Sequence, residues 1–371
     1  MKIGIEAQHL FREQKYGREM ATLETLRGIQ TIDNQNEYVI FVKPDMDNAC
    51  LQQSLNIKIV ELKSFFHPLW EQFSLMKAAK SEGCDILHCT SGTAPVYTDI
   101  PLLLTLRATD IVKSANDEQV EKAAAYKKWN LPKAVGKAHT ILTFSEYEKQ
   151  KIMQHYPKAE GKIQLLTHGL REDFKTISNK KELQKVRDKY KLPERFLLLP
   201  GNKALQENTE NVLKAYAIFC SKNKPVPLVM VDFSKTRLKK ILARIGEEQL
   251  MEHITTTGYI INTDLPYIYN LSELFLFPVK SASFGYQILE AMACGTPVLT
   301  SASAHLEEIS DNAAYTANPE SEEEISLGIF RILNNKSLKN KNINKGVKIT
   351  KDLSWITTAR QTLQLYASVK H

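Results

Sequence analysis

Short apolar runs alternate along the chain with longer stretches in which apolar residues recur at helical spacing. Continuous apolar runs are typical of parallel strands that are buried on both faces. Strand–helix alternation predicts βαβ units and doubly wound sheets, an α/β fold. The expected strands are residues 2–7, 38–42, 57–62, 85–89, 102–106, 140–144, 163–167, 196–200, 228–231, 255–259, 274–278 and 297–300.

A polar stretch from Arg171 to Glu194 interrupts this alternation. After it the opening pattern of strand, glycine loop and helix restarts at Phe196. Two successive Rossmann-like domains follow from this restart. The expected division is an N-terminal domain at 1–172, a linker at 173–194, a C-terminal domain at 195–352 and a closing helical segment at 353–371.

Composition narrows the class of protein. No apolar run approaches the roughly 20 residues that span a bilayer, and the chain starts on an apolar strand without the features of a signal peptide. The five scattered cysteines favour a reduced compartment, so we expect a cytoplasmic protein. The net charge of +7 favours anionic partners such as phosphates or a membrane surface. Alternatively, it reflects only lysines that are solvated on the protein surface. The lysine-dense stretch at 334–351 has no interleaved aromatics, which argues against nucleic-acid binding.

Three segments carry a resemblance to a known family. Residues 284–298 read FGYQILEAMACGTPV, residues 198–202 read LLPGN and lead through Asn208 into a helix, and residues 2–7 read KIGIEA with Gly17 and Arg18 after a loop. Together they resemble the retaining glycosyltransferases of the GT-B fold, family four. The resemblance implies two Rossmann-like domains facing across a cleft, with the last helix packed back on the N-terminal domain.

The resemblance also implies a function. It is the transfer of a sugar from a nucleotide-sugar donor to a glycan or lipid-linked acceptor, with retention and without a metal or another cofactor. Association with the inner face of the membrane and with a partner glycosyltransferase stay open.

The expected donor site lies where two strands of the second domain end. A helix N-terminus offers free N–H groups to a diphosphate, and glycine lets the backbone approach a ligand closely. Glu290 corresponds to the family carboxylate that binds the ribose hydroxyls; alternatively it is an exposed helix acid or an internal hydrogen-bond partner. The donor-binding candidates are Gly201, Asn202, Lys203, Lys280, Phe284, Gly285, Tyr286, Gln287 and Glu290.

The acceptor side is expected in the first domain. His88 and Ser91 end a predicted strand, and Arg107 could bind a phosphate or else form an ion pair. One histidine between two cysteines does not match a zinc site, so no metal is expected. The candidates for the acceptor side or the cleft are Gly17, Arg18, His88, Ser91, Arg107, Asp110 and Ser145. Ser145 and Glu148 also predict a capping box at the start of a helix over 146–156.

At three places the sequence departs from the family pattern. Gln206 and Glu207 stand where the family has Arg and Lys, and Ala282 stands where it has a glutamate. Where the family usually has a His-Asp pair, this chain has residues Arg107 to Asp110. The histidine is absent from this stretch. These departures leave catalytic residues unassigned. They leave open a second function, a catalytically degenerate scaffold that binds a nucleotide, a glycan or a partner glycosyltransferase.

Overall fold

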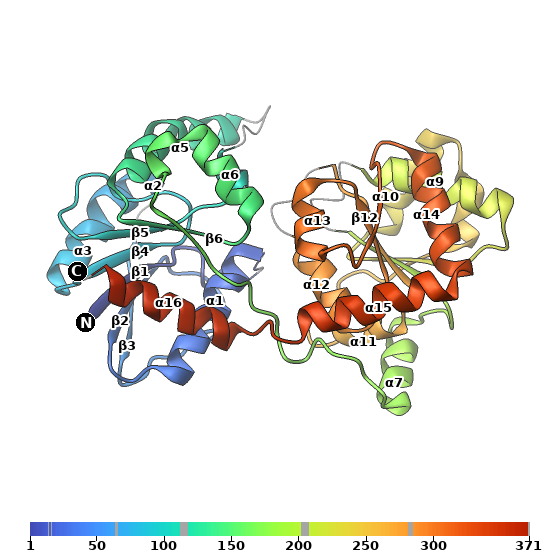
Figure 1. Cartoon of the computed structure of the whole chain (residues 1–371), viewed down its shortest axis with the longest axis horizontal. Helices are drawn as coiled ribbons and strands as arrows, with labels where there is room; N and C mark the ends of the chain where they lie inside the picture. Colours follow the sequence, from blue (N-terminus) through green and yellow to red (C-terminus); the bar gives the residue numbers. More distant parts are fainter. Residues whose placement is uncertain are drawn as a thin grey trace. The chain divides into compact units, whose positions relative to one another are not determined.

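The computed structural model describes residues 1–13, 15, 17–63, 66–111, 118–201, 208–280 and 285–369, without the side chains of residues 118–123. The chain divides into two compact units (Figure 1). The first contains Met1–Gly169 and Leu353–His371, and the second contains Leu170–Asp352. Each unit holds its own parallel sheet. All twelve expected strands form, and their ends differ from the expected ones by at most three residues.

The first unit is a seven-stranded parallel sheet in the order β3-β2-β1-β4-β5-β6-β7. Its strands are β1 (Lys2–Glu6), β2 (Glu37–Val42), β3 (Ile57–Glu61), β4 (Ile86–Cys89), β5 (Leu102–Thr105), β6 (Thr140–Thr143) and β7 (Ile163–Leu165). Its helices are α1 (Gly17–Ile32), α2 (His67–Leu69), the π-helix η1 (Trp70–Leu75), α3 (Met76–Ser81), α4 (Ala108–Ile111), α5 (Glu118–Lys137), α6 (Glu146–His155), the 3-10 turn η2 (Pro157–Ala159) and α16 (Trp355–Ser368).

Consecutive apolar residues of one strand pack on both faces of this sheet. In β5, Leu103 belongs to the core under α1 and α16, whereas Leu102 and Leu104 belong to the core under η1, α3, α5 and α6. Successive side chains of a strand point to opposite faces. A continuous apolar run is therefore what a sheet covered on both faces requires.

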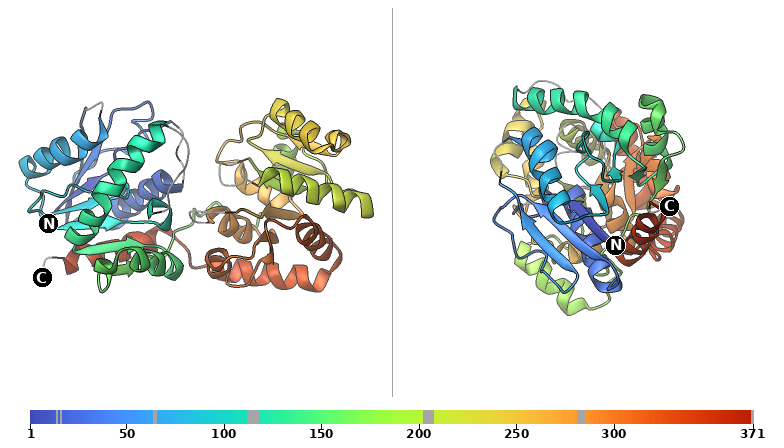
Figure 2. Two further views of the ribbon diagram at one scale, coloured as in Figure 1. Left: turned by 90° about the horizontal axis from the view of Figure 1, so that it is seen from above. Right: turned by 90° about the vertical axis from the view of Figure 1, so that its left-hand side faces the viewer.

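The last helix completes the first unit. α16 lies beside α1, and both ends of the chain are in this unit (Figure 2). Gly28 of α1 makes this close packing possible. A Cβ added there would come within 2.8 Å of the Trp355 carbonyl oxygen and 2.9 Å of the Ala359 Cβ.

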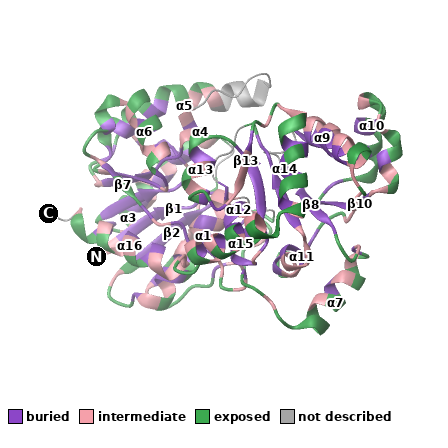
Figure 3. Ribbon diagram, turned by 45° about the vertical axis from the view of Figure 1, so that its right-hand side comes forward, coloured by how far each residue is buried: buried purple, intermediate pink, exposed green. Residues whose placement is uncertain are grey.

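The second unit is a six-stranded parallel sheet in the order β10-β9-β8-β11-β12-β13. Its strands are β8 (Leu197–Pro200), β9 (Leu228–Val231), β10 (Ile254–Thr256), β11 (Leu274–Phe277), β12 (Val298–Ser301) and β13 (Tyr315–Ala317). Its helices are α7 (Lys180–Tyr190), α9 (Thr209–Lys222), α10 (Lys235–Ile245), the 3-10 turn η3 (Glu248–Glu252), α11 (Leu265–Leu271), α12 (Tyr286–Ala293), α13 (Ala304–Ser310), α14 (Glu322–Asn334) and α15 (Lys336–Thr350). Its strands are largely buried between helices whose outer faces are exposed (Figure 3).

Two features of the second unit differ from the sequence expectation. β13 was not expected, because Tyr315-Thr316-Ala317 is not an apolar run and its first two residues are only partly buried. The stretch at 173–194, expected as a linker, contains α7 and belongs to the second unit. Its polarity reflects a largely exposed helix with Val186 as its buried contact, capped by the Asn179 side chain (Figure 3).

In the part of the chain that the structure describes, no helix combines the length and apolar character needed to cross a membrane.

The α1–α16 contact gives a stability prediction. Gly28→Ala should lower the free energy of unfolding by about 1–2 kcal/mol, because overpacking outweighs the gain in helix propensity. Gly136→Ala in α5 is the matched control, since its Cβ would meet only the Lys158 Cδ at 3.9 Å. It should leave stability unchanged or raise it by up to about 1 kcal/mol. Urea denaturation of the three proteins compares them, and equal stabilities for Gly28→Ala and wild type would contradict the close helix packing.

Candidate functional site

Each sheet reverses its strand order once. In the first unit the reversal lies between β1 and β4, and in the second it lies between β8 and β11. Ligands of open parallel sheets bind beyond the carboxyl ends of the strands at such a reversal. The positions of the candidate residues can therefore be compared with the carboxyl ends of β1 and β4 in the first unit and of β8 and β11 in the second.

Gly201 follows β8 at the reversal of the second sheet. A Cβ at this position would lie 2.5 Å from the Val231 carbonyl oxygen and 2.6 Å from that of Asp232. The Gly201 N–H also donates to the Val231 oxygen at 2.7 Å. The backbone passing the end of β9 thus demands glycine here, whether or not a ligand binds. Asn202 and Lys203 lie outside the described residues, as do Gln206 and Glu207.

Asn208 ties the end of β11 to the loop after β13. Its buried side-chain amide donates to the carbonyl oxygens of Pro278 and Pro319, at 2.7 and 2.8 Å. Both prolines follow strands of the second sheet, so one side chain fixes two loops at the same edge. Sequence reasoning used Asn208 only as a marker of the family pattern. This bridging role could not be found without the fold.

The start of α12 forms the other side of this edge. Gly285 is the N-cap, and Tyr286 and Gln287 open the helix as half-buried residues. Lys280 is exposed and forms an ion pair with Glu320 at 3.4 Å. Phe284 and Ala282 lie outside the described residues. At the other end of the helix, Gly295 follows the C-cap residue and has φ +74°, a conformation that favours glycine.

Glu290 is a half-buried carboxyl on α12. Its Oε2 accepts a hydrogen bond from the hydroxyl of buried Tyr269 at 3.1 Å. Burial raises the pKa of Glu290 to about 7, although the Tyr269 hydrogen bond and the charge of Arg171 act in the opposite direction. The carboxyl therefore changes charge near neutral pH. No sequence signal pointed to Tyr269 as its partner.

In the first unit, Glu6 holds the two strand ends of the reversal together. This buried carboxyl at the end of β1 accepts hydrogen bonds from the backbone N–H groups of Gln8, Thr90 and Ser91, each at 3.0 Å. The Ser91 hydroxyl also donates to it at 2.9 Å. Burial raises the pKa of Glu6 despite these hydrogen bonds. The side chain of Ser91 thus has a structural partner in Glu6. Glu6 was not identified from the sequence as a site residue, because a single acidic residue at the end of a strand resembles a surface residue.

Asp110 is the centre of a buried ion cluster. Its carboxylate contacts the Arg18 guanidinium at 2.7 Å and the Lys127 ammonium at 3.0 Å, and it accepts the Arg107 backbone N–H at 3.0 Å. Burial alone would raise its pKa, but Arg18 and Lys127 outweigh that effect and hold the pKa of Asp110 at about 2. Gly92, at φ +83°, leaves room for this carboxylate, which would lie 2.6 Å from an added Cβ. Arg18 is placed by the first turn of α1, which begins at Gly17.

His88 is buried in β4 between two hydroxyl groups. Its Nδ1 lies 2.7 Å from the Tyr366 Oη of α16, and its Nε2 lies 2.7 Å from the Thr105 Oγ1 of β5. Burial lowers the pKa of His88 to about 4, so the ring is neutral at physiological pH. His88 therefore joins α16 to the sheet.

Ser145 is the N-cap of α6, and its hydroxyl oxygen accepts the Glu148 N–H at 3.1 Å. This confirms the expected helix start. The Glu148 carboxylate accepts the Thr143 hydroxyl at 2.8 Å, so it bonds to β6. The proposed acceptor role of Ser145 stays a prediction.

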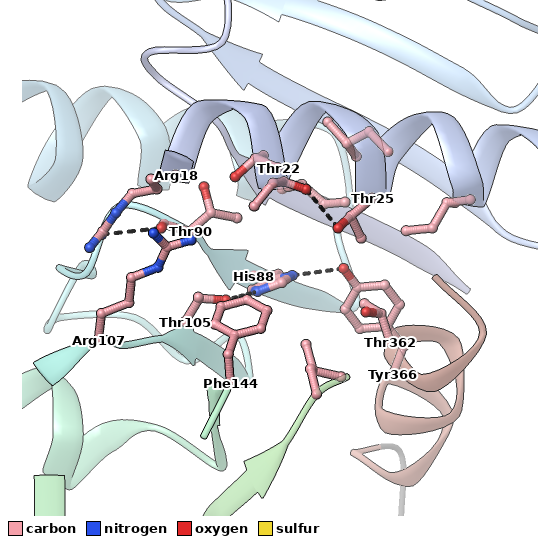
Figure 4. A pocket seen from close by; sticks show the side chains of 15 residues that line it. Arg18, Thr22, Thr25, His88, Thr90, Thr105, Arg107, Phe144, Thr362 and Tyr366 are labelled. Atoms are coloured by element: carbon pink, nitrogen blue, oxygen red, sulfur yellow. Dashed lines mark hydrogen bonds between the residues drawn. The ribbon is translucent and has the colours of Figure 1, made fainter. Parts of the chain in front are cut away.

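Three of the first-unit candidates line one hollow. Arg18, His88 and Arg107 surround it together with residues of α1, the strand ends and α16 (Figure 4). Arg107 is buried, with its guanidinium carbon 5.3 Å from the centre of the Phe144 ring. Ser91 lines a second, adjoining hollow that shares Arg18. Within the described ranges, no three His, Cys, Asp or Glu side chains are grouped as a metal site.

The ion cluster gives a prediction with a pH signature. Because the folded pKa of Asp110 lies below the usual 3.8, its charge stabilises the fold above that value and loses its effect as pH falls toward 2. Asp110→Asn should lower the free energy of unfolding by about 2 kcal/mol at pH 7, and this deficit should shrink between pH 4 and pH 2. Asp99→Asn is the control, because Asp99 is 96% exposed and its contact with Lys80 spans 3.5 Å. A deficit that does not change with pH would contradict the proposed charge pairing.

Comparison with known proteins relates the second unit to a family of enzymes. Residues 179–349 match the family model of the group 1 glycosyl transferases. O-antigen chain mannosyltransferase B of Escherichia coli is 27% identical over 244 residues, which cover 65% of this chain and 64% of that protein. The serotype-specific mannosyltransferase WbdA of Escherichia coli is 24% identical over 285 residues, 75% of this chain but 35% of the relative. The aligned part thus spans less than two thirds of the first relative and about a third of the second.

Among solved structures, sucrose-phosphate synthase from Thermosynechococcus elongatus superposes with a TM-score of 0.76 at 17% identity. The match covers 99% of this chain and 98% of the other. It shows a shared GT-B fold with two Rossmann-like units, and the family model covers most of the second unit. Residues 179–349 therefore carry the sequence signature of the group 1 glycosyl transferases, and the chain has the GT-B fold.

Proposed function

We propose that this chain transfers a sugar, with retention, from a nucleotide-sugar donor to a glycan or lipid-linked acceptor. The observation that carries the proposal is the half-buried carboxyl of Glu290 on α12, the helix that starts beside the reversal of the second sheet. A carboxylate there has lone pairs left to accept ribose hydroxyls. Its one hydrogen bond among the described residues comes from Tyr269.

The diphosphate of the donor binds, on this proposal, between the Gly201 turn and the start of α12. N–H groups at a helix N-terminus and its positive dipole end favour an anion. They would stabilise the charge that develops on the departing diphosphate without a metal or another cofactor, which is the main electrostatic contribution expected for such a transfer. Lys280 is near enough in sequence to contribute, although it pairs with Glu320 in the structure.

Mannose is the sugar that the relatives favour. Both relatives described above are mannosyltransferases by name, and one is named for an O-antigen chain. We therefore propose a nucleoside diphosphate mannose as the donor and a growing polysaccharide as the acceptor. We propose that the reaction takes place in the cytoplasm, where nucleotide sugars are available, and that the acceptor lies at the inner face of the membrane.

One observation favours the alternative, a catalytically degenerate scaffold. The carboxylate of Asp110 is buried and paired with Arg18 and Lys127, so it is not available to a substrate. Its neighbour in the family pattern, a histidine, is absent. A scaffold would bind a nucleotide, a glycan or a partner glycosyltransferase without turnover. Nucleotide release from nucleoside diphosphate mannose, measured beside binding, separates the two functions.

Titration calorimetry with nucleotide sugars tests the donor site. Their diphosphate is diesterified and does not titrate near pH 7, so a pH dependence reports on the protein. Because the pKa of Glu290 is raised to about 7, the accepting carboxylate is mostly protonated at pH 6 and mostly ionised at pH 8. Donor affinity should rise roughly tenfold across this interval. Glu290→Gln should lower affinity at pH 8 by roughly 10- to 100-fold and remove the pH dependence.

Glu252→Gln is the matched control, an exposed glutamate at the end of η3 in the same unit. It should bind the donor as wild type does. Glu290→Gln should be at least as stable as wild type above pH 7, because a raised folded pKa means that ionisation of Glu290 opposes folding. Equal donor affinity in Glu290→Gln and wild type would remove Glu290 from the site.

A further inference from the structure

The helical segment that follows β3 is partly inverted, with polar side chains turned inward and apolar ones outward. Trp70 packs in the core, but the carboxyl of Glu71 and the amide of Gln72 are buried as well. Leu69 is 52% exposed and Phe73 is 68% exposed. A helix on a water-facing surface normally has the opposite arrangement, because buried polar groups and exposed apolar ones both cost free energy. Such a local conflict is expected at functional sites.

Hydrogen bonds hold the two polar side chains inside. The Glu71 carboxyl accepts the hydroxyls of Thr93 and Tyr126. The Gln72 amide accepts the Val96 N–H at 2.9 Å and donates to the Tyr126 oxygen at 2.7 Å. Turning the helix so that its exposed apolar residues entered the core would break these bonds and leave buried polar groups unpaired. The fold therefore fixes the apolar side chains on the outside.

Aromatic side chains of α5 extend this outer surface. The ring centre of Tyr126 lies 5.2 Å from that of His67 in α2 and 5.7 Å from that of Trp129. Trp129 is 40% exposed, on the outer side of α5 (Figure 3). Both helical segments pack on the same core, so their outer sides are neighbours. Leu69, Phe73, Tyr126 and Trp129 together form what we call the apolar surface.

Lysines border the apolar surface on both segments. Lys77 stands about one helical turn beyond Phe73, and the Lys133 ammonium lies 4.0 Å from the centre of the Trp129 ring. The stem of a lysine can lie along apolar groups while its charged head stays in water or reaches a headgroup. The exposed lysines are Lys77 and Lys80 on α3 and Lys128, Lys133 and Lys137 on α5.

Acidic side chains offset only part of this charge. Asp99 contacts Lys80 at 3.5 Å. Glu82, the residue after α3, pairs with Lys58 of β3. Among the described side chains of α2, η1, α3 and α5, the only carboxyl is the buried one of Glu71. The exposed lysines of α3 and α5 thus outnumber the acids near them, and the border of the apolar surface is cationic.

We propose that the apolar surface and its lysines bind an anionic lipid membrane. The apolar and aromatic side chains enter the boundary between headgroups and acyl chains, and the lysines attract the lipid phosphates. A protein partner fits less well because lysine is depleted in protein interfaces, and a second copy would bring like charges together across a two-fold contact. If sugar transfer is the function, this surface holds the first unit where a lipid-linked acceptor lies. That role rests on the proposed function, whereas the lipid binding does not.

Co-sedimentation of the full chain with lipid vesicles, without any donor, tests the proposal. The vesicles contain phosphatidylcholine alone, or phosphatidylcholine and phosphatidylglycerol in equal amounts. Binding should be at least about tenfold tighter to the anionic vesicles and should weaken with added salt, because salt screens the lysines. Lipid with bromine on its acyl chains should quench the tryptophan fluorescence of the wild type. Trp129→Phe should remove most of that quenching, because Trp70 is buried.

A first pair of substitutions tests the apolar contribution. Leu69→Ser with Phe73→Ser should weaken binding to the anionic vesicles at least about tenfold, because less apolar area leaves water. Leu327→Ser with Phe330→Ser is the matched control. It removes a partly exposed Leu and Phe from α14 of the second unit and should bind vesicles as wild type does.

A second pair tests the charge. Lys128→Gln with Lys133→Gln should weaken binding to the anionic vesicles roughly tenfold or more and leave binding to phosphatidylcholine unchanged. Lys239→Gln with Lys240→Gln is the control, since both lysines are exposed on α10 of the second unit. All of these substitutions are at exposed positions, so urea denaturation should show stabilities close to that of the wild type.

Equal binding to both kinds of vesicle, or wild-type binding by the variant of Leu69 and Phe73, would overturn the proposal. So would an equal loss of binding in the second-unit controls. If analytical ultracentrifugation showed a wild-type dimer that this variant dissociates, and no vesicles were bound, the surface would belong to a second copy instead. Nucleotide binding at Glu290 is not involved, so failure of either test leaves the other proposal standing.

Discussion

The strands of a parallel sheet all have their carboxyl ends on the same side of the sheet. This constraint determines where the loops of both units lie. All main-chain ladders of the two sheets are parallel, so each sheet has one edge at which all its strands terminate. The strand order can reverse only by sending successive crossovers in opposite directions, and at the reversal the loops move apart. Glu6 holds the loops together on the first unit's edge, and Asn208 does so on the second. Both residues are buried polar groups that satisfy backbone atoms of two different loops.

The carboxyls near these edges fall into two kinds. Glu6, Asp110 and Glu148 are buried, and their oxygens are occupied by backbone, hydroxyl or cationic partners within the first unit. Glu290 is only half-buried, and its hydrogen bond among the described residues comes from Tyr269. A carboxyl that is desolvated enough to have a pKa near 7, yet still accessible, is suited to bind a ligand rather than to hold the fold. This contrast distinguishes the second unit's edge from the first.

The sequence predicted the strands well because buried parallel strands are continuous apolar runs, and Leu102 to Leu104 serve both faces of the first sheet. It missed β13, because Tyr315-Thr316-Ala317 is not an apolar run. It interpreted the exposed helix α7 as a linker, because an exposed helix and a linker are both polar. The start of α12 and Glu290 could be located because the family motif is local in sequence. The bonds of Glu6 and His88 could not, since their partners lie 84 and 278 residues away along the chain. Gln206, Glu207 and Ala282 carry the departures from the family pattern and lie outside the described residues.

The central claim is that the second unit binds a nucleotide at the reversal of its sheet. Hydrogen–deuterium exchange with and without a saturating nucleoside diphosphate mannose tests it most directly, because exchange reports each segment separately. The account predicts added protection in peptides that contain Gly201 and in those that cover Gly285 to Glu290, while α7 and α10 exchange unchanged. Protection confined to the first unit, or to helices of the second unit remote from the strand ends, would contradict it.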